Sequence, residues 1–136
     1  MLSGPCGARR SKSRHPKPLS QEADCVYDSA MAFLKLDDLE EREIVPGYRA
    51  RFVHSDNVTL AYWTIDEGAA LPEHSHPHEQ VANVLEGTFS LTVDGEAREV
   101  RPGDVAVIPG GVAHSGRAVT ACRIVDVFHP VREDYR

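Results

Sequence analysis

The sequence predicts an all-β protein built as a single small barrel, and two observations lead to that prediction. From residue 44 onwards, short segments rich in β-branched and aromatic residues alternate with turns that contain Gly, Pro, Asp or Asn. Segments at this spacing are typical of a β-sandwich or barrel. The length of 136 residues suits one domain, which can bury a core without disulfide bonds.

The strands are expected in close succession along the chain. Two come first, Tyr48–His54 and Val58–Ile65, with a Ser-Asp-Asn turn between them. Asp94-Gly95 is a strong hairpin signal, and Pro109-Gly110-Gly111 ends a short apolar segment. Before these strands, residues 32–43 are expected to form a helical turn or an edge segment with an acidic face. The remaining strands are expected at Val81–Leu85, Thr88–Val93, Glu96–Val100, Val105–Ile108, Val112–Ser115 and Val119–Phe128.

Residues 1–30 differ in composition from the rest and are predicted to be a disordered basic extension. Residues 1–20 hold five basic residues and no acidic one, and they are rich in Ser, Gly and Pro. Such a segment cannot bury enough apolar surface to offset its ordering entropy, and it lacks the apolar region of a secretory signal. We hypothesise that it arises from an upstream start codon, so that the functional domain is residues 31–136.

Charge and cysteine content narrow the expected partners and location. Residues 31–136 hold ten basic and eighteen acidic residues, and a net charge of −8 argues against a nucleic-acid surface. No apolar run approaches the roughly 18 residues of a membrane span, so no membrane partner is expected. Cys6, Cys25 and Cys122 are odd in number and show no CxxC spacing, which fits a reducing compartment and predicts a cytoplasmic location.

Residues 68–87 contain the strongest chemical signal in the chain. Three histidines, His74, His76 and His78, lie within five positions and are followed by a glutamate and a glutamine. Side chains two apart on a strand point to the same face, and neutral imidazole is a common metal ligand. This stretch therefore predicts part of a metal site, which needs at least one further ligand from elsewhere in the chain.

A second cluster, residues 103–116, supplies that ligand as His114. Residues 68–87 read Gly-x5-His-x-His-x3-Gln-x6-Gly, and residues 103–118 read Gly-x5-Pro-x-Gly-x2-His-x3-Ala. Together they resemble the two motifs of the cupin superfamily, with Gln80 where the family has a glutamate and Ala118 where it has an asparagine. The resemblance implies a jelly-roll-like barrel and a divalent metal ion of unknown identity (Ni, Zn, Fe or Mn). The implied metal ligands are His74, His76, Gln80 and His114.

The neighbours of Gln80 leave alternatives for the ligand set. Glu79 should point away from Gln80 on an extended segment, but it would replace Gln80 as a ligand if the strand were bulged. His78 is expected beside the ligands or in solvent. A neutral glutamine among three neutral imidazoles would leave the full charge of a divalent ion on the site, which favours an anionic substrate.

The C-terminal residues 124–136 give a narrower resemblance. Asp126 and Phe128 share a face of the last expected strand, and an acid in an apolar run is costly unless it has a partner or a role. With HSHPHEQ and the terminal DVFxPxRED, the chain resembles the KdgF family of pectin- and alginate-degradation cupins. That resemblance implies conversion of 4,5-unsaturated monouronates to linear keto acids. It also implies roles near the substrate for three residues: Asp126 would move protons, Arg132 would hold the carboxylate, and Phe128 would shape the pocket.

Three alternatives stay open from the sequence. A cupin oxygenase or a polyketide cyclase would use a similar barrel and metal site, and an aromatic-lined cavity would favour the cyclase. Aromatic residues are few in the barrel region, which favours a small polar substrate such as a sugar acid. A non-catalytic cupin that binds a small ligand is the third reading. A homodimer is expected through edge strands, because small β folds must cover their edges.

Overall fold

The computed structural model describes residues 32–136, so the predictions for residues 1–30 lie outside the described part. The described chain is nearly all β, as predicted, with two short 3-10 helices, η1 (Leu36–Asp38) and η2 (Glu133–Tyr135). None of its helices is long and apolar enough to cross a membrane. The strands are β1 (Arg42–Val45), β2 (Tyr48–His54), β3 (Thr59–Ile65), β4 (Ala70–His74), β5 (Glu79–Glu86), β6 (Phe89–Val93), β7 (Glu96–Val100), β8 (Val105–Ile108), β9 (His114–Ala118) and β10 (Cys122–His129).

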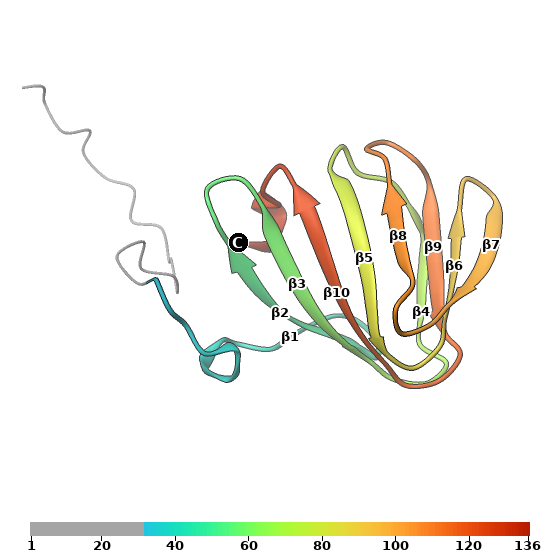
Figure 1. The fold of residues 1–136 in the computed structure, drawn as a ribbon, viewed down its shortest axis with the longest axis horizontal. Coiled ribbons are helices and arrows are strands. Elements are labelled where there is room, and N and C mark those ends of the chain that lie inside the picture. Colours follow the sequence, from blue (N-terminus) through green and yellow to red (C-terminus); the bar gives the residue numbers. More distant parts are fainter. Residues whose placement is uncertain (1–31) are drawn as a thin grey trace, which may run out of the picture.

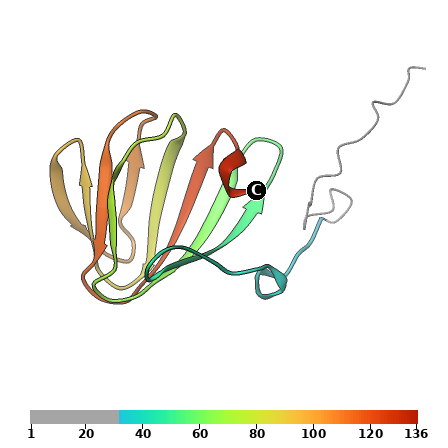
Figure 2. The ribbon, with the colours of Figure 1, turned by 180° about the vertical axis from the view of Figure 1, so that it is seen from behind.

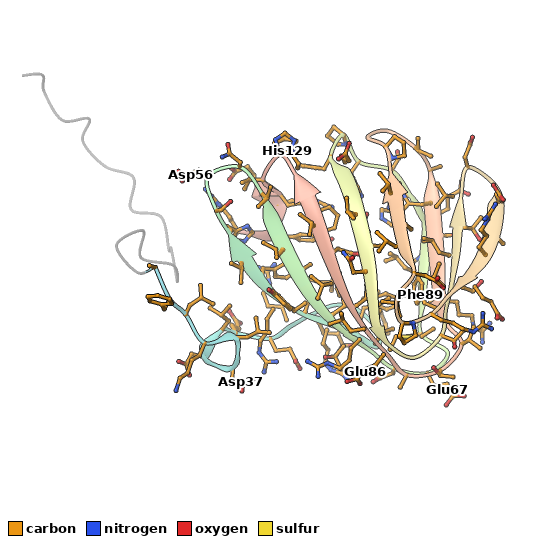
Figure 3. The ribbon with its side chains drawn as sticks, in the orientation of Figure 1. Asp37, Asp56, Glu67, Glu86, Phe89 and His129 are labelled. Atoms are coloured by element: carbon orange, nitrogen blue, oxygen red, sulfur yellow. The ribbon has the colours of Figure 1, made fainter. Side chains whose placement is uncertain are left out.

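The strands form two antiparallel sheets that curve around a common interior (Figures 1 and 2). One sheet has the order β1-β2-β3-β10-β5-β8, and the other has the order β4-β9-β6-β7. Figure 1 shows the β4–β5 connection, the end of β10 and η2 at the same end of the barrel. Figure 3 places His129 at that end and Glu67 and Glu86 at the opposite end. The histidine motif and the C-terminal tail are therefore brought together.

Alternating burial along β3 and β10 builds the interior. On each strand every second residue is buried, so residues 59, 61, 63 and 65 of β3 share the inner face with residues 122, 124, 126 and 128 of β10. The register pairs Asp126 with Ala61 on one side and with Ala82 of β5 on the other. The acid thus sits at the centre of the larger sheet, flanked by two small side chains.

The structure confirms most expected strands, although several of them have different ends. β2, β7 and β8 have the predicted ends, while β9 and β10 start two and three residues later than predicted. The region 32–43 contains both expected features, a helical turn at η1 and an edge strand that begins at Arg42. The bounds of β4 were not predicted, although a strand carrying His74 was expected, because the segment ALPEH contains a proline and does not alternate between buried and exposed residues.

Gly87 shows why a glycine is needed at the end of the first motif. Its φ is +84°, in the left-handed region that favours glycine. A Cβ at this position would also clash with the carbonyl oxygen of Ala121. The tight turn between β5 and β6 and its close packing against the start of β10 both require a residue without a side chain.

Candidate metal centre

Three histidines converge at the end of the barrel where β4 and β5 connect. His74 is the last residue of β4, His114 is the first residue of β9, and the two are direct cross-strand partners. Their ring centroids are 4.3 Å apart, and the ring of His76 lies 4.9 Å from that of His114. One nitrogen from each of the three rings can be chosen so that all lie within 4.8 Å of one another.

His76 reaches the cluster differently from the expectation. The prediction of a shared strand for His74 and His76 is wrong, because β4 ends at His74 and His76 lies in the following loop. Residues of the second motif, 103–118, hold that loop in place. The backbone N–H of Gly111 donates to the carbonyl of His76 at 2.8 Å, and a Cβ on Gly110 would clash with the carbonyl of Pro77.

The backbone orients all three imidazoles in the same way. Nδ1 of His74 donates to the carbonyl of Pro72 at 2.8 Å, and Nδ1 of His114 donates to Val112 at 2.9 Å. Nδ1 of His76 donates to the carbonyl of His78 at 3.0 Å. A proton fixed on Nδ1 leaves the lone pair of Nε2 for a metal, which is the usual arrangement of histidine ligands.

Gln80 joins this cluster, and Glu79 does not. Gln80 is buried on β5, and its Oε1 lies 3.1 Å from Nε2 of His76. Glu79 is exposed, as alternation along the strand requires. The carbonyl of His78 accepts the hydrogen bond from His76, and its ring lies 5.7 Å from that of His76, so His78 borders the cluster.

The donor atoms suit a divalent transition metal. Nε2 of His114 is buried and has no hydrogen-bond partner among residues 32–136. Because Nδ1 of His76 carries the ring proton, its Nε2 and the facing oxygen of Gln80 are both acceptors, and a shared cation would satisfy both. Three imidazole nitrogens and one amide oxygen match the preferences of Ni, Zn, Fe and Mn and leave coordination positions open.

His76 and His114 are held neutral, which a metal ligand requires. Burial lowers the pKa of His76 to about 4, with further lowering by the charges of Arg132 and His114. Burial also lowers the pKa of His114. Neutral imidazoles at physiological pH can bind a metal without first releasing a proton from the ring.

Asp126 lies beside the cluster and is almost fully buried. The indole N–H of Trp63 donates to its Oδ2 at 2.9 Å, while its Oδ1 has no hydrogen-bond partner within residues 32–136. Burial raises the pKa of Asp126 to about 7, although the Gln80 amide, the Trp63 indole and Arg132 each act to lower it. A carboxyl group with such a pKa can donate or accept a proton near neutral pH.

Arg132 and Phe128 stand together next to His76. Phe128 is buried and meets the His76 ring edge-on, with centroids 5.6 Å apart. The guanidinium carbon of Arg132 lies 4.8 Å from the ring centroid of Phe128 and 4.2 Å from that of Tyr135, two rings that meet edge-on with centroids 6.0 Å apart. Its Nε and Nη2 donate to the two oxygens of Asp134 at 2.9 Å and 2.7 Å. The arginine is therefore held by two aromatic rings and, along one edge, by a carboxylate.

A cavity extends from this site into the barrel, and the empty space in and in front of it, open solvent included, is about 740 Å³. Its polar lining includes Gln80, His114 and Asp126. Five aromatic residues also line it: Tyr48, Trp63, Phe89, Phe128 and Tyr135. The small number of aromatic residues in the sequence was therefore a poor guide, because several of them converge on this one space.

Sequence reasoning missed several residues of the site. Trp63 holds Asp126, and Asp134 and Tyr135 hold Arg132. Alternation along β3 places Trp63 on the inner face, so the strand pattern contained a usable signal for it. Nothing in the sequence of the tail identifies which charged residue pairs with Arg132.

Comparison with known proteins agrees with this geometry. Residues 61–128 match the family model of the cupin domain. An uncharacterised protein of Streptomyces coelicolor is 30% identical over 102 residues, covering 74% of this chain and 97% of the relative. The pectin degradation protein KdgF of Dickeya dadantii is 26% identical over 102 residues, covering 73% of this chain and 93% of the relative. The solved structure of KdgF from a Halomonas species is 27% identical with a TM-score of 0.73, covering 78% of this chain and 99% of that one.

The chain is a two-sheet β barrel with three converging histidines that could hold a metal ion, and it belongs to the cupin family. Within that family it is similar to the KdgF proteins of Dickeya and Halomonas in sequence and in structure. The resemblance inferred from the two histidine motifs and the C-terminal tail is confirmed.

Proposed function

We propose that this cupin is a metal-dependent enzyme that converts 4,5-unsaturated monouronates to linear keto acids during pectin or alginate breakdown. The observation that carries the proposal is the position of Asp126, a buried carboxyl group with a pKa of about 7. It lies beside Gln80, which in turn contacts His76 of the histidine cluster. Similarity to a pectin degradation protein supports the substrate class.

His74, His76, Gln80 and His114 would hold the metal ion. A divalent ion bound by these neutral ligands would supply Lewis-acid stabilisation of negative charge on a substrate oxygen. The protein excludes bulk water from this region, because Gln80 and His114 are both buried. Electrostatic interactions in such a site are stronger than in water.

Asp126 is assigned the proton transfers. The substrate is a cyclic enol ether with a carboxylate and an anomeric hydroxyl. Loss of the hydroxyl proton to Asp126 forms the C1 carbonyl as the bond from C1 to the ring oxygen breaks, which leaves an enolate at C5. Return of the same proton to C4 gives the linear keto acid, so the step is an isomerisation with no external reagent. Trp63 keeps the carboxyl group oriented through its Oδ2 and leaves Oδ1 for the substrate.

Arg132 is assigned the substrate carboxylate. A guanidinium has two edges that can each bind a carboxylate with two hydrogen bonds. Asp134 occupies the edge formed by Nε and Nη2, so the edge formed by Nη1 and Nη2 is the one that the substrate would use. Phe128 would shape the pocket between this arginine and His76.

The test is the loss of ultraviolet absorbance of unsaturated monouronates, followed beside a metal assay on the same protein. Asp126→Asn should lower turnover by about 100-fold or more while metal content stays unchanged. Asp56→Asn, in an exposed turn, is the matched control and should keep full activity. Full activity of the Asp126→Asn variant would show that the role given to Asp126 is wrong.

One observation favours a second candidate. The cavity is lined by five aromatic rings and many aliphatic side chains, which suits a larger, less polar enol substrate than a sugar acid. A metal-dependent cyclase acting on polyketide-like substrates would make use of that lining. Turnover of such a substrate, with none of any unsaturated monouronate, would select this candidate.

A homodimer located in the cytoplasm is part of the same proposal. β8 is an edge strand of the larger sheet, and its Val105 and Val107 are 56% and 63% exposed. Exposed valines on an edge strand favour burial against a second copy. Sedimentation of the purified protein as a monomer would remove this part of the proposal.

A further inference from the structure

Three buried polar atoms that line the barrel cavity have no hydrogen-bond partner among residues 32–136. They are Nε2 of His114, Oδ1 of Asp126 and the hydroxyl of Tyr48. The proposed metal and the proposed proton transfers account for the first two. Neither accounts for the hydroxyl of Tyr48, and buried polar groups in folded proteins nearly always have a partner.

The ring of Tyr48 is fixed by its neighbours. Tyr48 is the first residue of β2 and is 2% exposed. Its ring meets those of Trp63 and Phe89 edge-on, with centroids 5.9 Å and 6.5 Å away. Burial raises the pKa of Tyr48, so its hydroxyl stays protonated at neutral pH and can donate a hydrogen bond. The hydroxyl thus borders the cavity and cannot turn to solvent without breaking these contacts.

A phenylalanine at this position would keep the aromatic packing and avoid the cost of an unpartnered hydroxyl. We propose that the hydroxyl of Tyr48 is the inner polar anchor of a ligand subsite. It would donate a hydrogen bond to a hydroxyl or carbonyl oxygen of a ring-shaped ligand lying in the cavity. That ligand would extend from Tyr48 past Asp126 toward His114. The side chains of all three residues line the same cavity.

For a uronate substrate, this assignment rests on the proposed function. The substrate carboxylate would lie at Arg132. Tyr48 would therefore contact a hydroxyl group on the sugar ring, at a position away from the carboxylate. Tyr48 would then discriminate between unsaturated monouronates that differ in the configuration of one ring hydroxyl. A site built to hydrogen-bond a hydroxyl group rejects the analogue that cannot supply it.

Thermal unfolding of the metal-free, ligand-free protein tests whether the hydroxyl lacks a structural partner. Tyr48→Phe removes only the hydroxyl and should raise the melting temperature by a few degrees or leave it unchanged. The matched control is Tyr62→Phe, on the opposite face of the sheet, where the side chain does not line the cavity. A clear fall in melting temperature for Tyr48→Phe, or its failure to fold, would show a structural hydrogen bond and overturn the proposal.

Binding of two neutral rings tests the subsite without assuming any substrate. Trp63 is the single tryptophan of the chain and lines the cavity, so its fluorescence reports occupancy. The affinity ratio of cyclohexanol to methylcyclohexane cancels the packing of the ring and reports on the hydroxyl group. Tyr48→Phe should lower this ratio roughly 3- to 10-fold relative to wild type, a difference of the size of one hydrogen bond, while Tyr62→Phe leaves it unchanged. An unchanged ratio in Tyr48→Phe would overturn the proposal.

Turnover of unsaturated monouronates separates this proposal from the proposed function. If the wild-type protein linearises them, Tyr48→Phe should reduce kcat/KM for the preferred substrate roughly 3- to 10-fold. The ratio of the kcat/KM values of two epimeric substrates should then move closer to one. If the wild-type protein turns over none, the proposed function fails, and the affinity ratio of cyclohexanol to methylcyclohexane still decides on the subsite. An unchanged kcat/KM and an unchanged epimer ratio in an active Tyr48→Phe variant would contradict the assignment.

Discussion

At the scale of single residues, Asp126 and Gln80 give the site its chemical character. Asp126 is a carboxyl group in an apolar interior with one strong hydrogen bond, from Trp63. Gln80 provides a neutral oxygen where a glutamate is usual among cupins. A neutral ligand set leaves more positive charge for an anionic substrate, and a carboxyl group with a raised pKa can exchange a proton near neutral pH.

The raised pKa of Asp126 has a consequence for stability in the metal-free protein. Between about pH 4 and pH 7 the folded state keeps a proton on Asp126 that the unfolded state has released, so this group lowers stability as pH rises through that window. Asp126→Asn should therefore be more stable than the wild type above pH 7, by about 2–4 kcal/mol at most. The advantage should shrink toward zero below pH 4. Chemical unfolding of chelator-treated protein measures it, and an advantage that did not change with pH would contradict the pKa assigned to Asp126.

Gln80 offers a direct test of the neutral ligand set. Gln80→Glu adds a negative charge close to Asp126, which would lower the effective charge of the metal and raise the pKa of Asp126 further. Metal content should be kept or increased, while kcat for uronates should fall roughly 10- to 100-fold. Glu79→Gln, on the exposed side of the same strand, is the control and should change neither quantity. Equal or higher turnover by Gln80→Glu would show that the neutral amide is not needed.

At the scale of elements, the C-terminal tail acts as a clamp on one arginine. η2 carries Asp134, which binds one edge of the Arg132 guanidinium, and Tyr135, whose ring contacts it, and β10 supplies the ring of Phe128 as a further contact. The backbone N–H of Arg132 also donates to Thr59 of β3 at 2.9 Å. These contacts come from three elements and fix the backbone and the guanidinium of Arg132, which would reduce the entropy lost if a carboxylate bound there, as we propose.

Asp134→Asn tests this clamp. Loss of the carboxylate should loosen the guanidinium and raise KM for uronates about tenfold, with little change in kcat, because Arg132 positions the substrate and does not transfer protons. Glu133→Gln alters the adjacent acid, which lies 3.6 Å from Arg136, and should leave KM unchanged. A fall in kcat with no change in KM would instead place Asp134 in the chemical step.

Elements also show what the sequence could predict. Strands next to clear turn signals, such as β2 before Ser55-Asp56-Asn57 and β7 after Asp94-Gly95, were predicted to the residue, whereas the bounds of β4 were not, because Pro72 and weak alternation conceal them. Motif spacing indicated the histidines and Gln80, and the structure brings them together. The partners of Asp126 and Arg132 could not be predicted, because pairing across the barrel, 63 residues apart for Trp63 and Asp126, depends on the register of the sheets.

At the scale of the whole molecule, the barrel gathers the site from distant segments. One end collects the β4–β5 loop, the start of β9, the end of β10 and the C-terminal tail (Figure 1). The interior below that end is a cavity with aromatic walls, and three polar atoms in it, from Tyr48, His114 and Asp126, have no hydrogen-bond partner in the described part of the chain, residues 32–136. The fold thus brings Gln80 and His114 of the candidate metal site and the buried Asp126 to the wall of one cavity.

The central claim is that a metal ion held by the three histidines and Gln80 is needed to linearise an unsaturated monouronate. The most direct measurement follows this reaction with protein that has been stripped of metal by a chelator and then reloaded with one divalent ion at a time. The account predicts no turnover without metal, recovery with one equivalent of a suitable ion, and formation of a linear keto acid. Turnover that survives complete metal removal would contradict the account. So would the absence of turnover of every unsaturated monouronate after reloading with Ni, Zn, Fe or Mn.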